Sequence, residues 1–458
     1  MPEPRAIWDL TRRAIIAPAG HGKTELLARA SALGRRTLIL THTHAGVHAL
    51  RARLNRLQIP SEIVSVDTIA SWANKYVQAF PRLANFPPAN PRGAQWNQVY
   101  ESAARILQSE VVKTVIKASY DRILIDEYQD CELHQHGIAM ALSSIVPTVV
   151  FGDPMQGIFE FVETRIRWSE HIDNSFTTAY ELTEPHRWNT ANAELGQWIS
   201  YARQQLMTGQ PLDLRTGPMN FLPCNDAFEM GLFFNGFEQR DGTTAAIHCR
   251  RGVCNRLAQS TNGAYQAIEE IAAARLMDFA AAWDGAQTPN DRANALRAIL
   301  NDTMTQANAD GEVSADYTAP IVAAWQSLRQ TGSATHALEV ITRERAHPLA
   351  RTYRAELLND AKRALKDLEA GRRVNLVVSC EAVRHRLSHT GRAPTVRTIS
   401  TPLLLKGLEY DHVLIPDATH FLTETAAAKL FYVAISRARW SLTIASRNPV
   451  LRFPIPNL

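Results

Sequence analysis

Short apolar runs alternate with longer amphipathic stretches through the first half of the chain. The runs at residues 13–17, 37–41, 122–126 and 148–152 are apolar on both faces, which is typical of strands buried in a parallel sheet. In the stretches between them, such as residues 25–33, apolar positions recur at helical spacing. This alternation predicts a doubly wound α/β layer.

Strand-like runs return near the end of the chain, at residues 374–378, 395–399, 412–415 and 442–445. Two mostly helical segments separate the strand-rich regions, so we expect an α/β fold of two lobes with parallel sheets, each carrying a helical insertion. The predicted division is: residues 1–66, first segment of the first lobe; 67–120, helical insertion of the first lobe; 121–180, second segment of the first lobe; 181–262, first segment of the second lobe; 263–370, helical insertion of the second lobe; 371–458, second segment of the second lobe.

Composition and charge narrow the class of protein only a little. The chain has 458 residues, 45% of them hydrophobic, and a formal net charge of +4, which is too weakly basic to identify a nucleic-acid binder. No apolar run approaches the ~20 residues that cross a bilayer. The N-terminus lacks the basic start and apolar core of a signal peptide, and five scattered cysteines do not suggest a disulfide framework. We therefore expect a cytoplasmic protein without a membrane partner.

A candidate phosphate-binding loop follows the first predicted strand and opens a helix. Its glycines allow the backbone to curl so that N–H groups point at phosphate oxygens, while Lys23 supplies charge and Thr24 a ligand for Mg²⁺. The pattern is that of a P-loop with alanine in place of the first glycine. The candidate residues for binding the nucleotide are Ala17, Pro18, Ala19, Gly20, His21, Gly22, Lys23, Thr24 and Glu25.

Two carboxylates follow the predicted strand at residues 122–126. Ligands of open α/β sheets bind at the carboxyl ends of the strands, where Asp126 and Glu127 are expected. We predict that Asp126 holds the metal together with Thr24 and that Glu127 is the base for the attacking water.

The residues after Asp126 extend this pattern to Asp-Glu-Tyr-Gln-Asp at 126–130, which resembles motif II of the UvrD/Rep/PcrA branch of superfamily 1 helicases. Further strings resemble the other motifs of that family in the order the family requires. They are residues 41–45 (motif Ia), 66–71 (Ib), 152–161 (III), 182–187 with 245–250 (IV), 406–411 (V) and 430–439 (VI).

The resemblance implies two RecA-like P-loop lobes with ATP and Mg²⁺ bound between them. It also implies roles for single residues. Gln156 is expected to orient the water and the terminal phosphate, and Glu409 to contact the ribose. Arg187 and Arg437, from the second lobe, resemble arginine fingers that stabilise charge during phosphoryl transfer. The family's adenine-reading motif has no clear counterpart here, so the base preference stays open.

Contacts with single-stranded DNA are also implied by the resemblance. Aromatic rings stack on bases, and motif III supplies Phe159 and Phe161. Motif Ia supplies Thr41, His42 and Thr43, with histidine where the family has a stacking phenylalanine.

Two functions remain open from the sequence. The first is an ATP-dependent DNA helicase or translocase that acts on single-stranded or tailed duplex DNA with 3′-to-5′ polarity. The second is a DNA-sensing NTPase subunit of an anti-phage defence complex with a nuclease partner, for which the UvrD-like subunit of the Gabija system is a similar case. The helicase or translocase is our main interpretation, and the DNA-sensing subunit is the alternative. The modest length, the missing adenine-reading motif and the short helical insertions give weight to this alternative.

Overall fold

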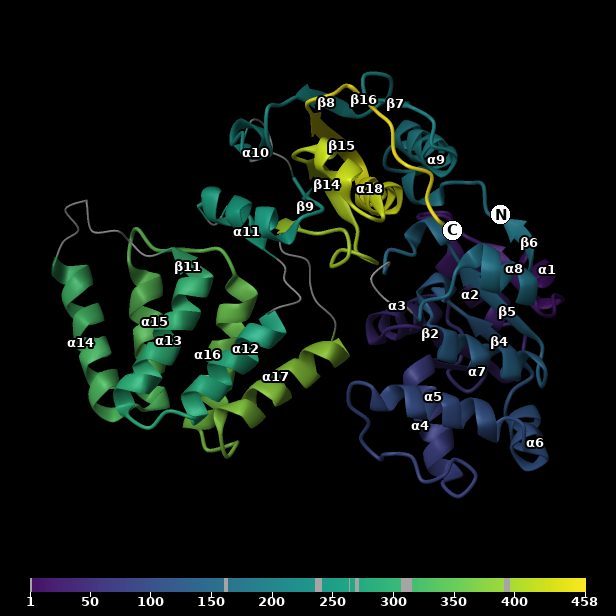
Figure 1. Cartoon of the computed structure of the whole chain (residues 1–458), viewed down its shortest axis with the longest axis horizontal. Coiled ribbons are helices and arrows are strands. Elements are labelled where there is room, and N and C mark those ends of the chain that lie inside the picture. Colours follow the sequence, from purple (N-terminus) through teal and green to yellow (C-terminus); the bar gives the residue numbers. More distant parts are fainter. Residues whose placement is uncertain are drawn as a thin grey trace. The chain divides into compact units, whose positions relative to one another are not determined.

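The computed structural model describes residues 2–159, 164–234, 241–262, 264–267, 272–305, 315–390 and 396–458 (Figure 1). The chain forms two compact units. The first comprises Met1–Asn220, Phe421–Leu442 and Asn448–Leu458, and the second comprises Phe221–His420 and Thr443–Arg447.

The first unit is built on a six-stranded sheet with the order β3-β2-β4-β5-β1-β6. Every neighbouring pair in this sheet is parallel, so all its strands end at the same edge. The strands are β1 (Arg13–Ile16), β2 (Thr37–Thr41), β3 (Val64–Thr68), β4 (Arg122–Ile125), β5 (Thr148–Gly152) and β6 (Thr177–Glu181).

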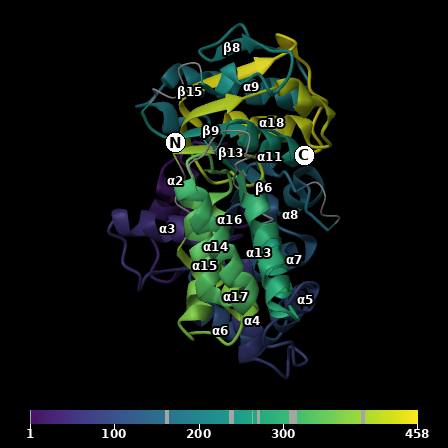
Figure 2. The same ribbon diagram turned by 90° about the vertical axis from the view of Figure 1, so that its left-hand side faces the viewer.

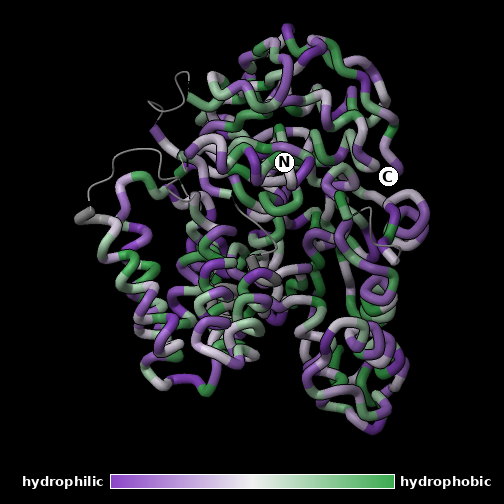
Figure 3. Tube along the Cα trace, turned by 60° about the vertical axis from the view of Figure 1, so that its left-hand side comes forward, coloured by the Kyte–Doolittle hydropathy of each residue, from purple (hydrophilic) through white to green (hydrophobic). Residues whose placement is uncertain are grey.

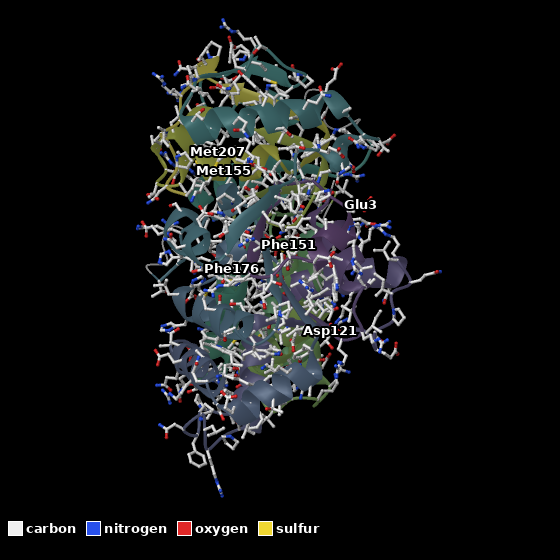
Figure 4. All side chains as sticks on the ribbon, turned by 90° about the vertical axis from the view of Figure 1, so that its right-hand side faces the viewer. Glu3, Asp121, Phe151, Met155, Phe176 and Met207 are labelled. Atoms are coloured by element: carbon white, nitrogen blue, oxygen red, sulfur yellow. The ribbon has the colours of Figure 1, made fainter. Side chains whose placement is uncertain are left out.

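Helices cover both faces of this sheet because alternate residues of each strand point to opposite sides. In β1, for example, Ala14 packs into one hydrophobic cluster and Ile15 into the other. Phe151 and Phe176, labelled in Figure 4, are fully buried. The helices of this unit are α1 (Pro4–Trp8), α2 (Lys23–Ser31), α3 (His44–Arg56), α4 (Ile69–Ala79), α5 (Gln95–Ile106), α6 (Glu110–Ser119), α7 (Leu133–Ser143), α8 (Asp173–Ser175), α9 (Ala193–Thr208) and α18 (Ala427–Ile435).

The second sheet has the order β10-β13-β9-β14-β15-β8, and β9 pairs in parallel with both β13 and β14. Its strands are β8 (Asn220–Pro223), β9 (Thr244–Ile247), β10 (Gln266–Ala267), β13 (Arg397–Ser400), β14 (Tyr410–Ile415) and β15 (Ala438–Ser446). The short pairs β7 (Leu212–Asp213) with β16 (Val450–Leu451), and β11 (Met304–Thr305) with β12 (Arg351–Thr352), are antiparallel.

A helical bundle in the second unit has its own hydrophobic core. Its helices run side by side (Figure 2), and hydrophobic and hydrophilic positions alternate along them (Figure 3). Its members are α12 (Ala272–Asp284), α13 (Pro289–Thr303), α14 (Ala315–Thr331), α15 (Ala334–Ala346), α16 (Ala355–Glu369) and α17 (Leu376–Thr390). The shorter α10 (Gly231–Phe234) and α11 (Arg251–Ser260) belong to the core of the second sheet.

The strand predicted at residues 374–378 is wrong, because α17 begins at Leu376. The main-chain N–H groups of Leu376 and Val377 donate to the carboxylate of Asp284, at 3.0 and 2.8 Å, and the Asn375 side chain accepts from Val378 N–H at 2.9 Å. These side chains cap a helix N-terminus. The apolar run therefore packs as a helix in the bundle core, although its β-branched valines favour a strand.

The predicted α/β class with two sheets is confirmed. Strands β3 and β6 were not among the runs singled out in the sequence, since polar residues interrupt both. The predicted domain ranges stay a prediction. Among the described residues no helix is long and apolar enough to cross a membrane.

Candidate functional site

The predicted phosphate-binding loop connects β1 to α2 at the edge of the sheet where the strands end. Gly20 and Gly22 adopt φ angles of 74° and 83°, in the left-handed region that glycine enters without steric cost. Gly22 is the residue before α2, whose first turn starts with Lys23. Free N–H groups at a helix N-terminus attract anions, so this loop is shaped to receive phosphate.

Lys23 lies between the two carboxylates that were predicted at the end of β4. Its Nζ atom is 2.8 Å from Oδ1 of Asp126 and forms an ion pair with Oε1 of Glu127. The side chains of Lys23 and Asp126 are only 11% and 7% exposed, whereas Glu127 is 32% exposed. Burial lowers the pKa of Lys23, but the two carboxylates outweigh it and raise that pKa above its ordinary value. Burial raises the pKa of Asp126 above its ordinary value, and the attraction of Lys23 offsets only part of this rise.

The end of β4 explains how these carboxylates reach the loop. β4 is buried between β2 and β5, and the N–H of Asp126 donates to Leu40 O at 2.7 Å, so the carboxylate leaves the sheet at its carboxyl edge. Glu127 then adopts a φ of 52°, which non-glycine residues rarely take and which costs of order 1–3 kcal/mol. Because the surrounding hydrogen bonds hold this conformation, the direction of the Glu127 side chain is set by the fold.

A chain of hydrogen bonds leads from Glu127 to Gln156. Gln129 Nε2 donates to Glu127 Oε2 at 2.6 Å, and Gln129 Oε1 accepts from the N–H of Asp153 at 3.0 Å. Asp153 Oδ2 accepts from Gln156 Nε2 at 3.0 Å. The ends of β4 and β5 thus bring the predicted base and the predicted phosphate sensor into one network.

The two predicted arginine fingers, Arg187 and Arg437, converge on Ser436, just after α18. Arg187 donates to the carbonyl of Ser436 at 2.6 Å, and Arg437 donates to the hydroxyl of Ser436 and to the carbonyl of Val433, both at 2.9 Å. They were expected in the second lobe, whereas the structure groups both with the first unit. The main-chain N–H of Arg187 also donates to Gly20 O at 2.9 Å, which joins this segment to the loop.

Glu25 and Glu409 were also predicted to bind the nucleotide. Glu25 forms ion pairs with Arg29 and Arg53, at 2.6 and 2.5 Å, so its carboxylate joins α2 to α3. Glu409 lies in the second unit, in an exposed loop after Gly407.

The predicted nucleic-acid contacts are only partly brought together. The rings of His42 and Phe159 lie 6.4 Å apart, centroid to centroid, and Thr43 is exposed at the start of α3. Thr41 is fully buried at the end of β2. Phe161 lies outside the described residues.

Several residues in or next to the network were missed by sequence reasoning. Besides Gln129 and Asp153, they are Tyr432, whose hydroxyl accepts from Ala19 N–H at 2.9 Å, Arg203, which lies 3.1 Å from Asp153, and Trp188. Gln129 and Asp153 lie inside strings that resemble motifs II and III, and Tyr432 inside the string that resembles motif VI, so the motif strings could have indicated them. Arg203 and Trp188 carry no such signal. Trp188 is fully buried, and a Cβ atom on Gly20 would lie 2.5 Å from its ring.

The donor set around Lys23 fits Mg²⁺ as a companion of bound nucleotide. The Thr24 hydroxyl and the Asp126 carboxylate are hard oxygen ligands, and the ammonium group of Lys23 shows that this carboxylate pair accommodates positive charge. No group of three or more His, Cys, Asp or Glu side chains that could hold a metal occurs among the described residues. Mg²⁺ usually takes one or two protein oxygens and completes its shell with phosphate and water, which suits this arrangement.

Comparison with known proteins gives a family match that lies within the first unit. The family described as UvrD/REP helicase N-terminal domain matches residues 94–177. Among solved structures, the chain is similar to Arterivirus nonstructural protein 10, a helicase solved in complex with DNA, with 11% identity and a TM-score of 0.28 over 52% of this chain and 47% of that chain. The chain therefore spans about half the length of that helicase chain. No curated protein matches it in sequence.

Proposed function

We propose that the first unit hydrolyses ATP, in keeping with the match of residues 94–177 to the UvrD/REP helicase N-terminal domain family. The observation that carries the proposal is the position of Lys23, at the end of the loop and in contact with both Asp126 and Glu127. A buried cation between two carboxylates can exchange partners when phosphate enters the loop. Lys23 would then bind the phosphate, and the carboxylates would become available for the metal and the water.

Each residue of the site has a task in this reaction. Thr24 and Asp126 would hold Mg²⁺, which neutralises charge on the phosphate oxygens when it is bound. Glu127, whose side chain is more exposed than those of Lys23 and Asp126, accepts the proton of the attacking water. Arg187 and Arg437 supply positive charge for the transition state.

We further propose that hydrolysis drives movement along single-stranded DNA with 3′-to-5′ polarity. The His42 and Phe159 rings give a stacking surface for bases, and the exposed Thr43 can donate to a phosphate. These residues lie on the same first unit as the loop, so the nucleotide and the DNA would be bound by a single compact body.

The decisive test is DNA-stimulated hydrolysis in the wild type and in Glu127→Gln. The variant should bind ATP with similar affinity but hydrolyse it about 10²–10⁴-fold more slowly, because the amide cannot accept the proton. Glu101→Gln is the matched control, since Glu101 is an exposed carboxylate on α5. Equal rates in Glu127→Gln and Glu101→Gln would refute the assignment.

An unwinding assay on tailed duplexes separates the two functions that the sequence left open. Strand separation from a 3′ tail supports the helicase. Rapid hydrolysis without strand separation, together with a nuclease that copurifies, supports the DNA-sensing subunit of a defence complex.

A further inference from the structure

A buried ion pair lies beside the candidate site and has none of the roles assigned above. It joins Asp153, at the end of β5, to Arg203, on α9. The carboxylate of Asp153 is fully buried, and the side chain of Arg203 is 3% exposed. Arg203 NH2 lies 3.1 Å from Asp153 Oδ1. A charge buried this deeply must be paired to be tolerated.

Arg203 has a second partner of a different kind. Its NH1 atom lies 2.8 Å from Glu181 Oε1, at the end of β6, and Glu181 is 42% exposed. Burial lowers the pKa of Arg203, but Asp153 and Glu181 together raise it above its ordinary value. Arg203 therefore stays charged. Its partner Asp153 is buried away from water, whereas its partner Glu181 is also solvated by water.

Asp153 uses its remaining hydrogen bonds to organise the segment after β5. Its Oδ1 atom accepts from the N–H of Met155 at 3.1 Å, and its Oδ2 atom accepts from Gln156 Nε2 at 3.0 Å. The side-chain NH₂ group of Gln156 is thereby fixed on Asp153, which sets the direction of the whole amide. The orientation of Gln156 therefore depends on the Asp153 side chain being held in place.

Helices α9 and α18 also contact the phosphate-binding loop. Ser200, one turn before Arg203 on α9, lies 3.4 Å from His21 Nε2, and the hydroxyl of Tyr432 on α18 accepts from the N–H of Ala19 at 2.9 Å. Burial, reinforced by Asp153, raises the pKa of Tyr432 above its ordinary value, so its hydroxyl stays protonated. Asp153 and the loop are thus held by one buried polar cluster.

We propose that Arg203 is a positioning residue for nucleotide hydrolysis. It holds the Asp153 carboxylate in place through their buried ion pair, and Asp153 in turn holds the Gln156 amide in the direction needed at the terminal phosphate. This inference rests on the proposed function, because it assigns Gln156 to that phosphate. The alternative is a purely structural role, in which Arg203 only joins α9 to β6 through its ion pair with Glu181.

Three variants separate these roles. Arg203→Met removes the charge at similar length, Arg203→Lys keeps the charge, and Glu181→Gln weakens only the exposed partner. If a displaced Gln156 misplaces the reacting groups by about 1 Å, kcat of DNA-stimulated hydrolysis should fall by ~100-fold in Arg203→Met. The KM for ATP should change little, Arg203→Lys should recover some of the lost kcat, and Glu181→Gln should behave as the wild type. Unchanged kcat in Arg203→Met, or an equal loss in Glu181→Gln, overturns the proposal.

Crystal structures of the variants give a readout that does not depend on activity. The Gln156 amide should turn away from residue 153 in Arg203→Met and remain on it in Glu181→Gln, and an unmoved amide in Arg203→Met overturns the proposal. A wild type that folds but hydrolyses no nucleotide refutes the proposed function instead. If Arg203→Met does not fold, Arg203→Met/Asp153→Asn removes both charges. Wild-type kcat in this double variant would overturn the role of Arg203, and a reduced kcat supports it.

Discussion

Replacing Lys23 by methionine should destabilise the nucleotide-free protein, because two carboxylates then lose the cation that they share. Removing one partner of a buried ion pair costs about 3–5 kcal/mol. Asp126 is nearly buried and bears the full cost, whereas Glu127 is 32% exposed and is partly screened by water. We therefore expect the free energy of unfolding to fall by about 3 kcal/mol at pH 8, or roughly 10 °C in Tm for a unit of this size.

The loss of stability in Lys23→Met should also depend on pH. Burial and Glu127 raise the pKa of Asp126, and Lys23 opposes them, so the pKa rises further in Lys23→Met. A group whose pKa is higher in the folded state takes up a proton more readily there, so its protonation favours folding at low pH. The difference between Lys23→Met and the wild type should therefore narrow between pH 8 and pH 5.

Thermal unfolding without nucleotide at the two pH values measures both effects. Lys75→Met is the matched control, since Lys75 pairs with Asp67 at 2.5 Å but is 68% exposed, and such a pair contributes at most about 1 kcal/mol. The double variant Lys23→Met/Asp126→Asn should recover much of the lost stability. If Lys23→Met is as stable as Lys75→Met at pH 8, the buried ion pair does not have the energy that we assign to it.

Three further predictions concern single residues. Gly20→Ala should lower the free energy of unfolding by about 2 kcal/mol or more, because φ is 74° and the new Cβ would lie 2.5 Å from the ring of Trp188. In denaturant titrations, Gly137→Ala on α7, where a Cβ meets nothing within 4 Å, should be harmless, and equal losses would contradict the role of Gly20. Burial lowers the pKa of His248 to about 3. Below about pH 6.5 this histidine is therefore protonated in the unfolded chain but stays neutral in the folded protein. The free energy of unfolding should consequently fall by about 2 kcal/mol between pH 7 and pH 5. His248→Gln should remove this contribution to the pH dependence in the same titrations, and an unchanged slope would show that other groups cause it. Phe159→Ala should weaken binding of single-stranded DNA by about 1–3 kcal/mol in a fluorescence titration while leaving ATP binding intact, and an unaltered affinity for DNA would exclude stacking on this ring.

Much of the first unit could be predicted because its signals are local. Four apolar runs correspond to β1, β2, β4 and β5, and the glycines before Lys23 lead directly into α2. The carboxyl edge of a parallel sheet collects the residues that follow its strands, so Asp126 could be placed near Lys23 from topology alone. The same reasoning failed at residues 374–378, where capping by the distant Asp284 and packing in the bundle overrode the strand propensity.

The sequence by itself determined the kind of sheet, the loop at the end of β1 and the carboxylates at the end of β4, because each follows from residues that are neighbours in the chain. Only the tertiary structure decided what surrounds them. Arg203 reaches Asp153 across 50 positions, and Arg187 reaches Ser436 across 249. Pairings at such distances depend on how helices pack on the sheet, since a buried charge is tolerated only where the packing brings a polar or oppositely charged partner within reach.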